Sequence, residues 1–341
     1  MKTRILLICP VLVLLAGCSD AADAPSAAAS VSDLRVVADT GPTATPAPAE
    51  VFPDGEPGTA IIHEDGWTTP IKLPFNDDGW EDSPYITRDG SAIIFFYHPY
   101  PDLISAEGTI TEYIINNPEE AVARGIDGKL YVSPRPFVNR YVHPISQDDS
   151  PALECCAYIS LGGDLFYNST RRSFELGQGV PVTVYRNGER LDFGTGESEE
   201  NPHYCDARDE LWFDCPGDTN LCVMRDAAQN NFQGEVELAP YPVNARDYEH
   251  VQDAQAYLTD DCQTLYITSD RDTPDLIQIY RLQRLDDEGL QWSEPTLFIS
   301  NETPIGELSM TADGTELIFA QIFWREDGTP GIDIYYSHRT E

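Results

Sequence analysis

Basic residues are scarce in this sequence. Lys and Arg number 21 among 341 residues, against 58 Asp and Glu, and the formal net charge is −37. So few cations cannot neutralise phosphates over an extended surface, which argues against a nucleic-acid-binding protein. A phosphate-binding glycine loop, a dinucleotide fingerprint and a Gly-x-Ser-x-Gly elbow are also absent from the sequence, which argues against nucleotide chemistry and serine hydrolysis. Apolar residues make up 41% of the chain, enough to bury a core, so it is not a disordered acidic tail.

The one strongly apolar run lies in residues 1–17 and is too short to span a bilayer; with its two basic residues it is typical of a secretory signal. Residues 15–18 (LAGC) resemble the bacterial lipobox, which implies cleavage before Cys18 and a lipid on its sulfur. Ser19, in place of Asp, favours the outer membrane by bacterial sorting habits. The alternative is an ordinary signal peptide with an incidental cysteine. We expect the membrane to be reached through the lipid alone.

Residues 18–56 are rich in Ala, Pro, Ser and Thr after the lipidated cysteine, and they lack the apolar periodicity needed to pack. They are interpreted as an extended tether, and residues 57–341 as the folded domain. Because an acidic surface repels anionic lipids, the lipid must do the anchoring at the cell envelope. The sequence gives no indication of the oligomeric state.

A repeated phrase runs through the folded part. Each copy is a short strand, a tight turn containing Asp or Gly, and a second, more apolar strand, which predicts a β-hairpin. The five copies lie at residues 84–96, 157–167, 202–213, 256–267 and 308–319. A third strand follows each hairpin, and an outer strand ends each of the first four units. The repeat therefore predicts an all-β protein built of four-stranded units.

The fifth copy ends after its third strand, at about residue 335. Residues 69–74, near the start of the domain, can supply its outer strand, because residues 67–70 match residues 292–295, which introduce the outer strand of the fourth copy. Pairing the two termini predicts a closed five-bladed β-propeller. A six-bladed alternative would make residues 125–130 an inner hairpin and leave roughly 35 residues for each of two blades, which is short for four strands.

The repeat resembles the TolB-type, WD40-like propeller repeat of bacterial envelope proteins, most specifically at residues 256–271 and 292–335. This resemblance implies a propeller that works in the cell envelope. Such repeats serve both as binding scaffolds and as enzyme frames. Our first functional prediction is a scaffold that binds an envelope protein or glycan, which leaves open whether the chain is an enzyme.

Acidic residues stand at the start of every predicted inner strand. Because the inner strands of a propeller line its central channel, we expect these acids to converge near one mouth of it. They are Glu81, Asp82, Glu154, Glu199, Glu200, Asp253 and Glu307. They could hold Ca²⁺, with Glu81 and Asp253 as ligands, in a structural propeller that requires no other cofactor. The alternative is that they are ordinary acids of the repeat.

A second, local resemblance is to five-bladed glycoside hydrolases of the arabinanase and β-xylosidase type. Residues 82–84 and 200–202 match two catalytic positions of that family. The resemblance implies Asp82 as general base and Glu200 as general acid of an inverting reaction, the alternative function. Glu154, followed by two cysteines, stands where the family has an Asp that tunes the acid, so the second blade departs from the pattern.

Aromatic residues lie on or beside the predicted inner strands. Candidates for ligand binding, together with Glu307, are Tyr85, Tyr158, His203 and Tyr257. They could stack on sugar rings, but packing between blades is the expected role of aromatics on half-buried strands. Two arginines in matching phrases, Arg171 and Arg271, are expected to pair with neighbouring acids.

Six cysteines follow Cys18, an even number that favours disulfides in an exported chain. Cys215 and Cys222 flank a short turn, so we predict a bridge between them, worth about 2–3 kcal/mol in the loop-entropy model. The other four are Cys155, Cys156, Cys205 and Cys262. The vicinal pair could bridge to each other or to the remaining two, and a redox or metal role is a further alternative.

Overall fold

The computed structural model describes residues 55–99, 128–147, 152–176, 182–193, 198–215, 220–246, 251–286 and 290–340. The predicted signal segment, Cys18, nearly all of the tether and the predicted insertion at residues 99–128, except for its ends, lie outside these described residues. Within them, no helix has both the length and the apolar character to cross a membrane.

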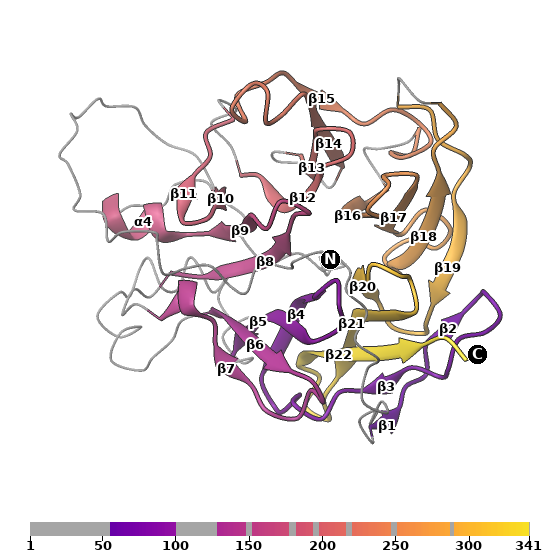
Figure 1. Ribbon diagram of the computed structural model, residues 1–341. Coiled ribbons are helices and arrows are strands. Elements are labelled where there is room, and N and C mark those ends of the chain that lie inside the picture. The colour runs from indigo at the N-terminus through magenta and orange to yellow at the C-terminus, as the bar shows by residue number, and fades with distance from the viewer. Residues whose placement is uncertain are drawn as a thin grey trace.

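Five antiparallel sheets are arranged around a central axis (Figure 1). From the axis outwards, the first blade consists of β4 (Trp80–Ile86), β5 (Ala92–His98), β6 (Lys129–Pro134) and β7 (Tyr141–Val142). The second consists of β8 (Glu154–Ile159), β9 (Leu165–Ser169), β10 (Thr183–Arg186) and β11 (Glu189–Arg190). The third consists of β12 (Glu200–Cys205), β13 (Glu210–Asp214), β14 (Leu221–Arg225) and β15 (Val236–Leu238).

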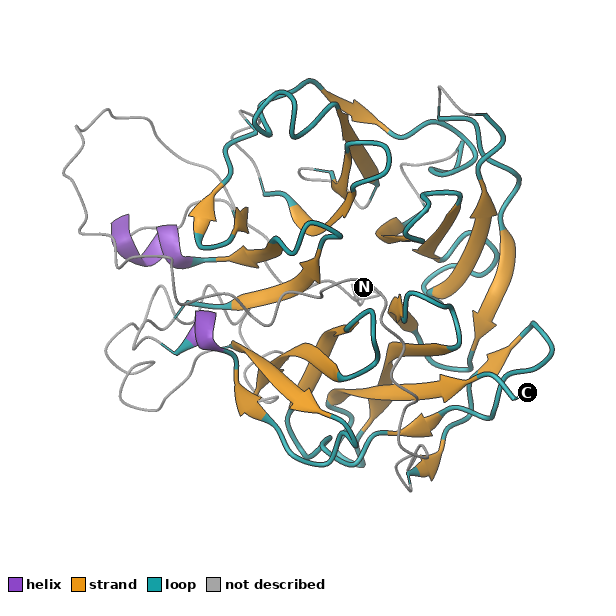
Figure 2. Cartoon of the chain, viewed as in Figure 1, coloured by secondary structure: helices purple, strands orange, loops and turns teal. Residues whose placement is uncertain are grey.

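The last two blades each recruit strands from the start of the domain. The fourth blade consists of β16 (Asp253–Leu258), β17 (Thr264–Ser269), β18 (Gln278–Gln283), β19 (Thr296–Ser300) and β2 (Ile61–Ile62). The fifth consists of β20 (Ile305–Met310), β21 (Glu316–Trp324), β22 (Pro330–His338), β3 (Ile71–Lys72) and β1 (Glu56–Pro57). The described helices are α4 (Arg171–Leu176) and the short 3₁₀ helix η2 (Pro144–Ser146), so the molecule is nearly all strand and loop (Figure 2).

The ring closes where the sequence predicts. β3 pairs with β22, with Ile71 opposite Tyr336 and Lys72 opposite Tyr335. The five-bladed prediction is therefore confirmed and the six-bladed alternative is wrong. The sequence did not predict β2, which pairs with β19 through Ile62 and Ile299 and ties the same N-terminal segment to the fourth blade as well.

Packing between blades explains why the inner strands are so deeply buried. Each inner strand is covered by a neighbouring blade on both faces, and every residue of β4, β16 and β20 is buried. A hydrophobic cluster joins the third and fourth blades and includes Trp212 against Trp292. Polar and acidic residues of the inner strands, such as Glu81 and Asp82, are therefore buried together with the apolar ones, and these strands show no clean alternation of apolar and polar residues.

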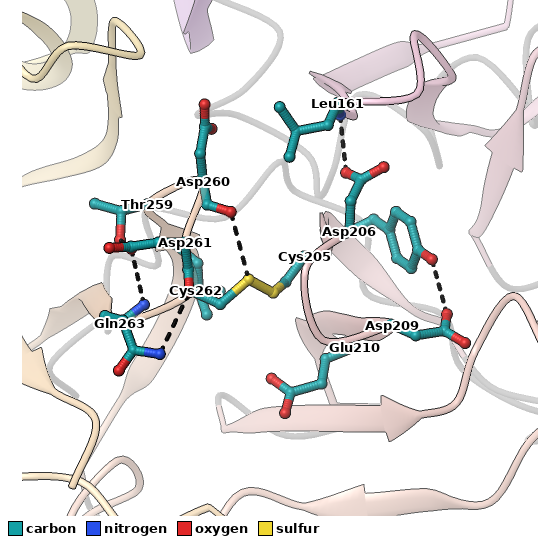
Figure 3. The surroundings of a disulfide bond; sticks show 12 residues. Leu161, Cys205, Asp206, Asp209, Glu210, Thr259, Asp260, Asp261, Cys262 and Gln263 are labelled. Atoms are coloured by element: carbon teal, nitrogen blue, oxygen red, sulfur yellow. Dashed lines mark hydrogen bonds between the residues drawn. A yellow bond between two sulfur atoms is a disulfide. The ribbon is translucent and has the colours of Figure 1, made fainter. Parts of the chain in front are cut away.

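Two disulfides reinforce this part of the ring. The Cys215–Cys222 bridge lies within the third blade, as the sequence predicts. The second bridge, Cys205–Cys262, joins the third blade to the fourth, with 6.1 Å between its Cα atoms (Figure 3). Cys155 and Cys156 are buried and are not bridged, so neither of the pairings considered for them from the sequence is present.

Candidate functional site

All five inner strands contain a β-bulge at the same place, shown by a register shift against the second strand of each blade. The bulge residue has a left-handed backbone although none is glycine, with φ between 49° and 59°. These residues are Ser83, Cys156, Asn201, Gln255 and Glu307, and all five line a cavity on the propeller axis. Left-handed conformations are uncommon outside glycine, so five at equivalent positions indicate a device of the fold that aims side chains into the channel.

Hydrogen bonds from the neighbouring blade hold most of these bulges. A side chain on the second strand of one blade accepts the amide N–H of the next blade's bulge residue. The pairs are Asn168 with Asn201 (2.9 Å), Asp214 with Gln255 (2.8 Å) and Thr268 with Glu307 (3.4 Å). In the first blade, the Ser83 N–H donates to the Glu307 carboxylate at 2.6 Å. The strained backbone is thus stabilised by contacts that also lock blade to blade.

Six of the seven acids predicted to converge fall into two sets, and the seventh, Glu199, is buried and belongs to neither. The first set, which we call the paired acids, lies two residues before the bulge and consists of Glu81, Glu154 and Asp253. Each forms an ion pair: Glu81 with Arg140 at 2.7 Å, Glu154 with Arg171, and Asp253 with Arg271. The expectation that Arg171 and Arg271 pair with neighbouring acids is therefore met, and the paired acids are fixed by arginines.

This pairing bears on the calcium hypothesis. Within the described ranges, no group of three or more His, Cys, Asp or Glu side chains is arranged to hold a metal ion. Glu81 and Asp253 do not fit a calcium site, because a guanidinium already contacts each carboxylate.

The second set, which we call the channel acids, consists of Asp82, Glu200 and Glu307, of which Glu307 lines the axial cavity. Asp82 is buried and accepts hydrogen bonds from the Trp80 indole (3.0 Å) and from the Ser83 N–H (2.9 Å). Glu307 also accepts from the Ser83 hydroxyl (3.0 Å) and from the Gln255 side-chain amide (3.1 Å). Burial, and after it the nearby charge of Asp82, raises the pKa of Glu307 well above its usual range.

Glu200 has a different neighbour. It lies opposite Asp214 on β13, is only 6% exposed, and its Oε2 atom has no hydrogen-bond partner. Burial, followed by Cys156 and Asp214, raises the pKa of Glu200 well above its ordinary value. Glu200 therefore keeps its proton to a higher pH than a solvated glutamate does, which is a property of a general acid.

Asp214 was missed in the sequence. Burial raises its pKa to about 7, against the opposing effect of hydrogen bonds from the Asn201 side chain (2.7 Å) and from the Gln255 N–H. The only signal was an acid at the end of the apolar run 211–213, where a charge has no obvious partner. Because it braces two bulges at once, Asp214 positions the polar side chains around the axis.

An aromatic collar occupies the next layer of the channel, two residues after the bulges. It consists of Tyr85, Tyr158, His203 and Tyr257, all buried. Ring centroids lie 5.6 Å apart for the first pair, 4.0 Å for Tyr158 and His203, and 5.1 Å for His203 and Tyr257. The rings thus pack from one blade to the next, the role favoured by the sequence. Burial lowers the pKa of His203 to about 3, which makes it a poor base at neutral pH.

The cavity left along the axis measures about 60 Å³. That is room for a few atoms only, since ligand pockets for drug-sized molecules occupy roughly 300–1,000 Å³. Glu307, whose pKa is raised, therefore lines a cavity with very little space.

A larger hollow lies between the third and fourth blades and was not predicted from the sequence. This lateral groove measures about 360 Å³ and is lined by Tyr241, Ala245, Arg246, Arg271, Asp272, Tyr280, Glu294, Pro295 and Leu297. The Arg246 guanidinium lies 4.0 Å from the centre of the Tyr241 ring, and the Tyr241 hydroxyl bonds to Glu294 at 2.8 Å. Tyr241 is 44% exposed, so part of its surface faces solvent.

A scan against protein family models finds none that matches the chain, and no curated protein matches its sequence. Among solved structures, the chain is similar to a protein from Agrobacterium tumefaciens described as TolB, with 9% identity over 82% of this chain and 98% of that chain and a TM-score of 0.39.

It is also similar to an endo-arabinase from Bacteroides thetaiotaomicron, with 13% identity over 79% of this chain and 97% of that chain and a TM-score of 0.43. A third similar structure is the catalytic domain of an α-L-arabinofuranosidase from Coprinopsis cinerea, with 10% identity over 80% and 96% and a TM-score of 0.47. Both kinds of propeller that the sequence resembles therefore occur among the matched structures. The likeness is one of fold, and the five-bladed assignment rests on the strand order of this chain.

Proposed function

We propose that this protein is a lipid-anchored propeller of the bacterial envelope that binds a neutral glycan through the lateral groove. The observation that carries the proposal is the contrast between the two hollows. The channel holds only about 60 Å³ and is lined by the aromatic collar, whereas the groove holds about 360 Å³ and opens on an exposed tyrosine. A sugar ring needs the larger space.

The chemistry of the groove supports a neutral, polyhydroxylated ligand. Its lining contains two arginines, Arg246 and Arg271, and two acids, Asp272 and Glu294, so its formal local charge is zero within a chain of net charge −37. Such a set offers both donors and acceptors for hydroxyl groups, beside the aromatic surface of Tyr241. A polyanionic glycan would meet repulsion from the acidic surface as a whole.

The test is binding of the full chain to immobilised neutral glycans such as arabinan and xylan, with polygalacturonate as the acidic comparison. Tyr241→Ala should weaken binding about tenfold, which corresponds to about 1.4 kcal/mol. The matched control is Tyr141→Ala, since Tyr141 is 58% exposed on β7 in the first blade. Equal affinity of the two variants for every glycan, or preference for polygalacturonate, would contradict the proposal.

A second candidate is the glycan hydrolase implied by the resemblance, with Asp82 as base and Glu200 as acid. The observation that favours it is the buried Glu200 carboxyl, which has a raised pKa and an unpartnered oxygen. Against it, Asp82 lies beside Glu307 while Glu200 lies beside Asp214, and the channel is narrow. Reducing-sugar release from the same glycans decides: release by the parent that is lost in Glu200→Gln would replace the scaffold with the enzyme.

A further inference from the structure

The vicinal thiols Cys155 and Cys156 are placed unlike the other cysteines of the described chain. They lie on β8 in the second blade, and the Cys156 thiol donates to the Cys155 sulfur with the two Sγ atoms 2.7 Å apart. Cys156 is the bulge residue of its blade, with φ 59°, so its side chain turns toward the propeller axis. Cys205, Cys215, Cys222 and Cys262 are all bridged.

The two thiols have different access to the channel. Cys156 lines the axial cavity, where its Sγ lies 3.5 Å from the Ser83 hydroxyl. Cys155 is 3% exposed and is not among the described residues that line the cavity. A molecule that enters the channel therefore contacts Cys156 first, and the Cys155 sulfur lies close enough to react with the Cys156 sulfur afterwards.

The cavity selects for size. Its volume of about 60 Å³ holds a few molecules the size of water, since one water needs about 10–15 Å³ of such space. Hydrogen peroxide is of that size, and a peptide disulfide is not.

We propose that Cys155 and Cys156 form a peroxide-reactive dithiol, with Cys156 as the nucleophile and Cys155 as the resolving thiol. The Cys156 sulfur attacks one peroxide oxygen, the O–O bond breaks, and the second oxygen leaves as water after taking up the thiol proton, which gives a sulfenic acid. The Cys155 sulfur then attacks the Cys156 sulfur, an S–S bond forms, and the hydroxyl leaves as a second water with the Cys155 proton. Two thiols are oxidised and one hydrogen peroxide is reduced to two waters.

The assay uses the folded full chain, treated with reductant under conditions that leave the Cys205–Cys262 bridge closed and then freed of reductant. The chain is then exposed to hydrogen peroxide, alkylated and cleaved with trypsin. Cleavage after Arg140 and Arg171 releases peptide 141–171, which contains no cysteine besides the vicinal pair. We expect this peptide to become lighter by two hydrogen atoms and to resist alkylation. Persistence of both thiols under peroxide would overturn the proposal.

Single variants test the division of roles. In Cys155→Ser, the sulfenic acid at Cys156 should persist and react with dimedone. In Cys156→Ser, dimedone labelling of Cys155 should be at least about tenfold weaker. Equal labelling of the two variants would overturn the assignment of Cys156 as nucleophile.

The wild-type chain supplies a test that needs no substitution. The vicinal pair should react at least about tenfold faster with hydrogen peroxide than with glutathione disulfide, which is too large for the cavity. Equal rates with the two oxidants would mean that the channel does not control access, and would overturn the proposal even if a cysteine variant failed to fold. The Cys205–Cys262 peptides should stay unchanged throughout and serve as the internal control.

Discussion

The paired acids and the channel acids lie only one or two positions apart in the repeat, yet their side chains have different partners. Glu81 and Asp82 are adjacent on β4, yet Glu81 contacts Arg140 while Asp82 lies beside Glu307. Successive side chains of a strand point to opposite faces, so a shift of one residue moves an acid from a guanidinium to another carboxyl. The comparison teaches that the repeat reveals where acids occur and not which partner each one meets.

The largest effect that would sharpen this comparison is expected at a paired acid. Arg271→Ala should lower the free energy of unfolding by about 3–5 kcal/mol, because it leaves the fully buried Asp253 carboxylate without its counter-charge. The matched control is Arg225→Ala, which breaks the exposed Arg225–Glu237 pair and should cost less than about 1 kcal/mol. Urea unfolding at pH 7 measures both, and similar losses in the two variants would mean that the paired acids are ordinary surface charges.

An effect of intermediate size is expected from pH. The pKa of Asp214 is 3.8 in its ordinary state and about 7 in the folded chain, so the folded chain binds this proton more tightly than the unfolded chain. The contribution of this proton to the free energy of unfolding is fully present below about pH 4 and is lost as the pH rises toward 7. The free energy of unfolding of the wild type should therefore fall, relative to that of Asp214→Asn, by on the order of a few kcal/mol between pH 4 and 7.

Urea unfolding of the wild type and of Asp214→Asn at several pH values between 4 and 8 gives this difference directly. The wild-type curve should fall relative to the variant and run parallel to it above pH 7. Curves that stay parallel over the whole range would show that Asp214 titrates as a solvated carboxyl, and that burial does not perturb this neighbour of the channel acid Glu200.

The smallest effect is expected at a channel acid. Glu200→Gln replaces a buried carboxyl whose Oε2 has no partner with a neutral group of the same shape. We expect a gain in unfolding free energy of up to about 1 kcal/mol that grows as the pH rises, because burial raises the pKa of Glu200 and disfavours its ionisation, whereas glutamine carries no charge. Glu154→Gln, in contrast, should destabilise the chain, because Glu154 is paired with Arg171. Destabilisation by both substitutions would break the comparison.

The fold could be predicted from the sequence because its information is periodic and local. Strand, turn and strand recur five times, and the missing fifth outer strand points to residues 69–74. β2 was not predicted, since a strand of two residues carries no alternation to recognise. The Cys215–Cys222 bridge was predictable from its short turn, whereas Cys205–Cys262 joins two blades across 57 residues and depends on their packing.

The candidate site was less predictable because it depends on the bulges. The extra residue of each bulge changes which of the following side chains point toward the channel. Nothing in the sequence of a single strand marks the position of the bulge. The sequence located Asp82, Glu200 and Glu307 but gave no means to separate them from the paired acids. Asp214 and the lateral groove arise from contacts between neighbouring blades, which no pattern within one repeat records.

The closure of the ring sets the order in which the protein can be made. Its completing contact joins Ile71 to Tyr336, so the first strands to be synthesised must wait for the last ones. Contacts of such long sequence separation form late and slowly in folding. For a chain that is exported, as we propose, this delay is useful. The ring cannot close on the ribosome before its C-terminal strands exist, which leaves a time window in which the chain can pass through a membrane unfolded and assemble on the far side.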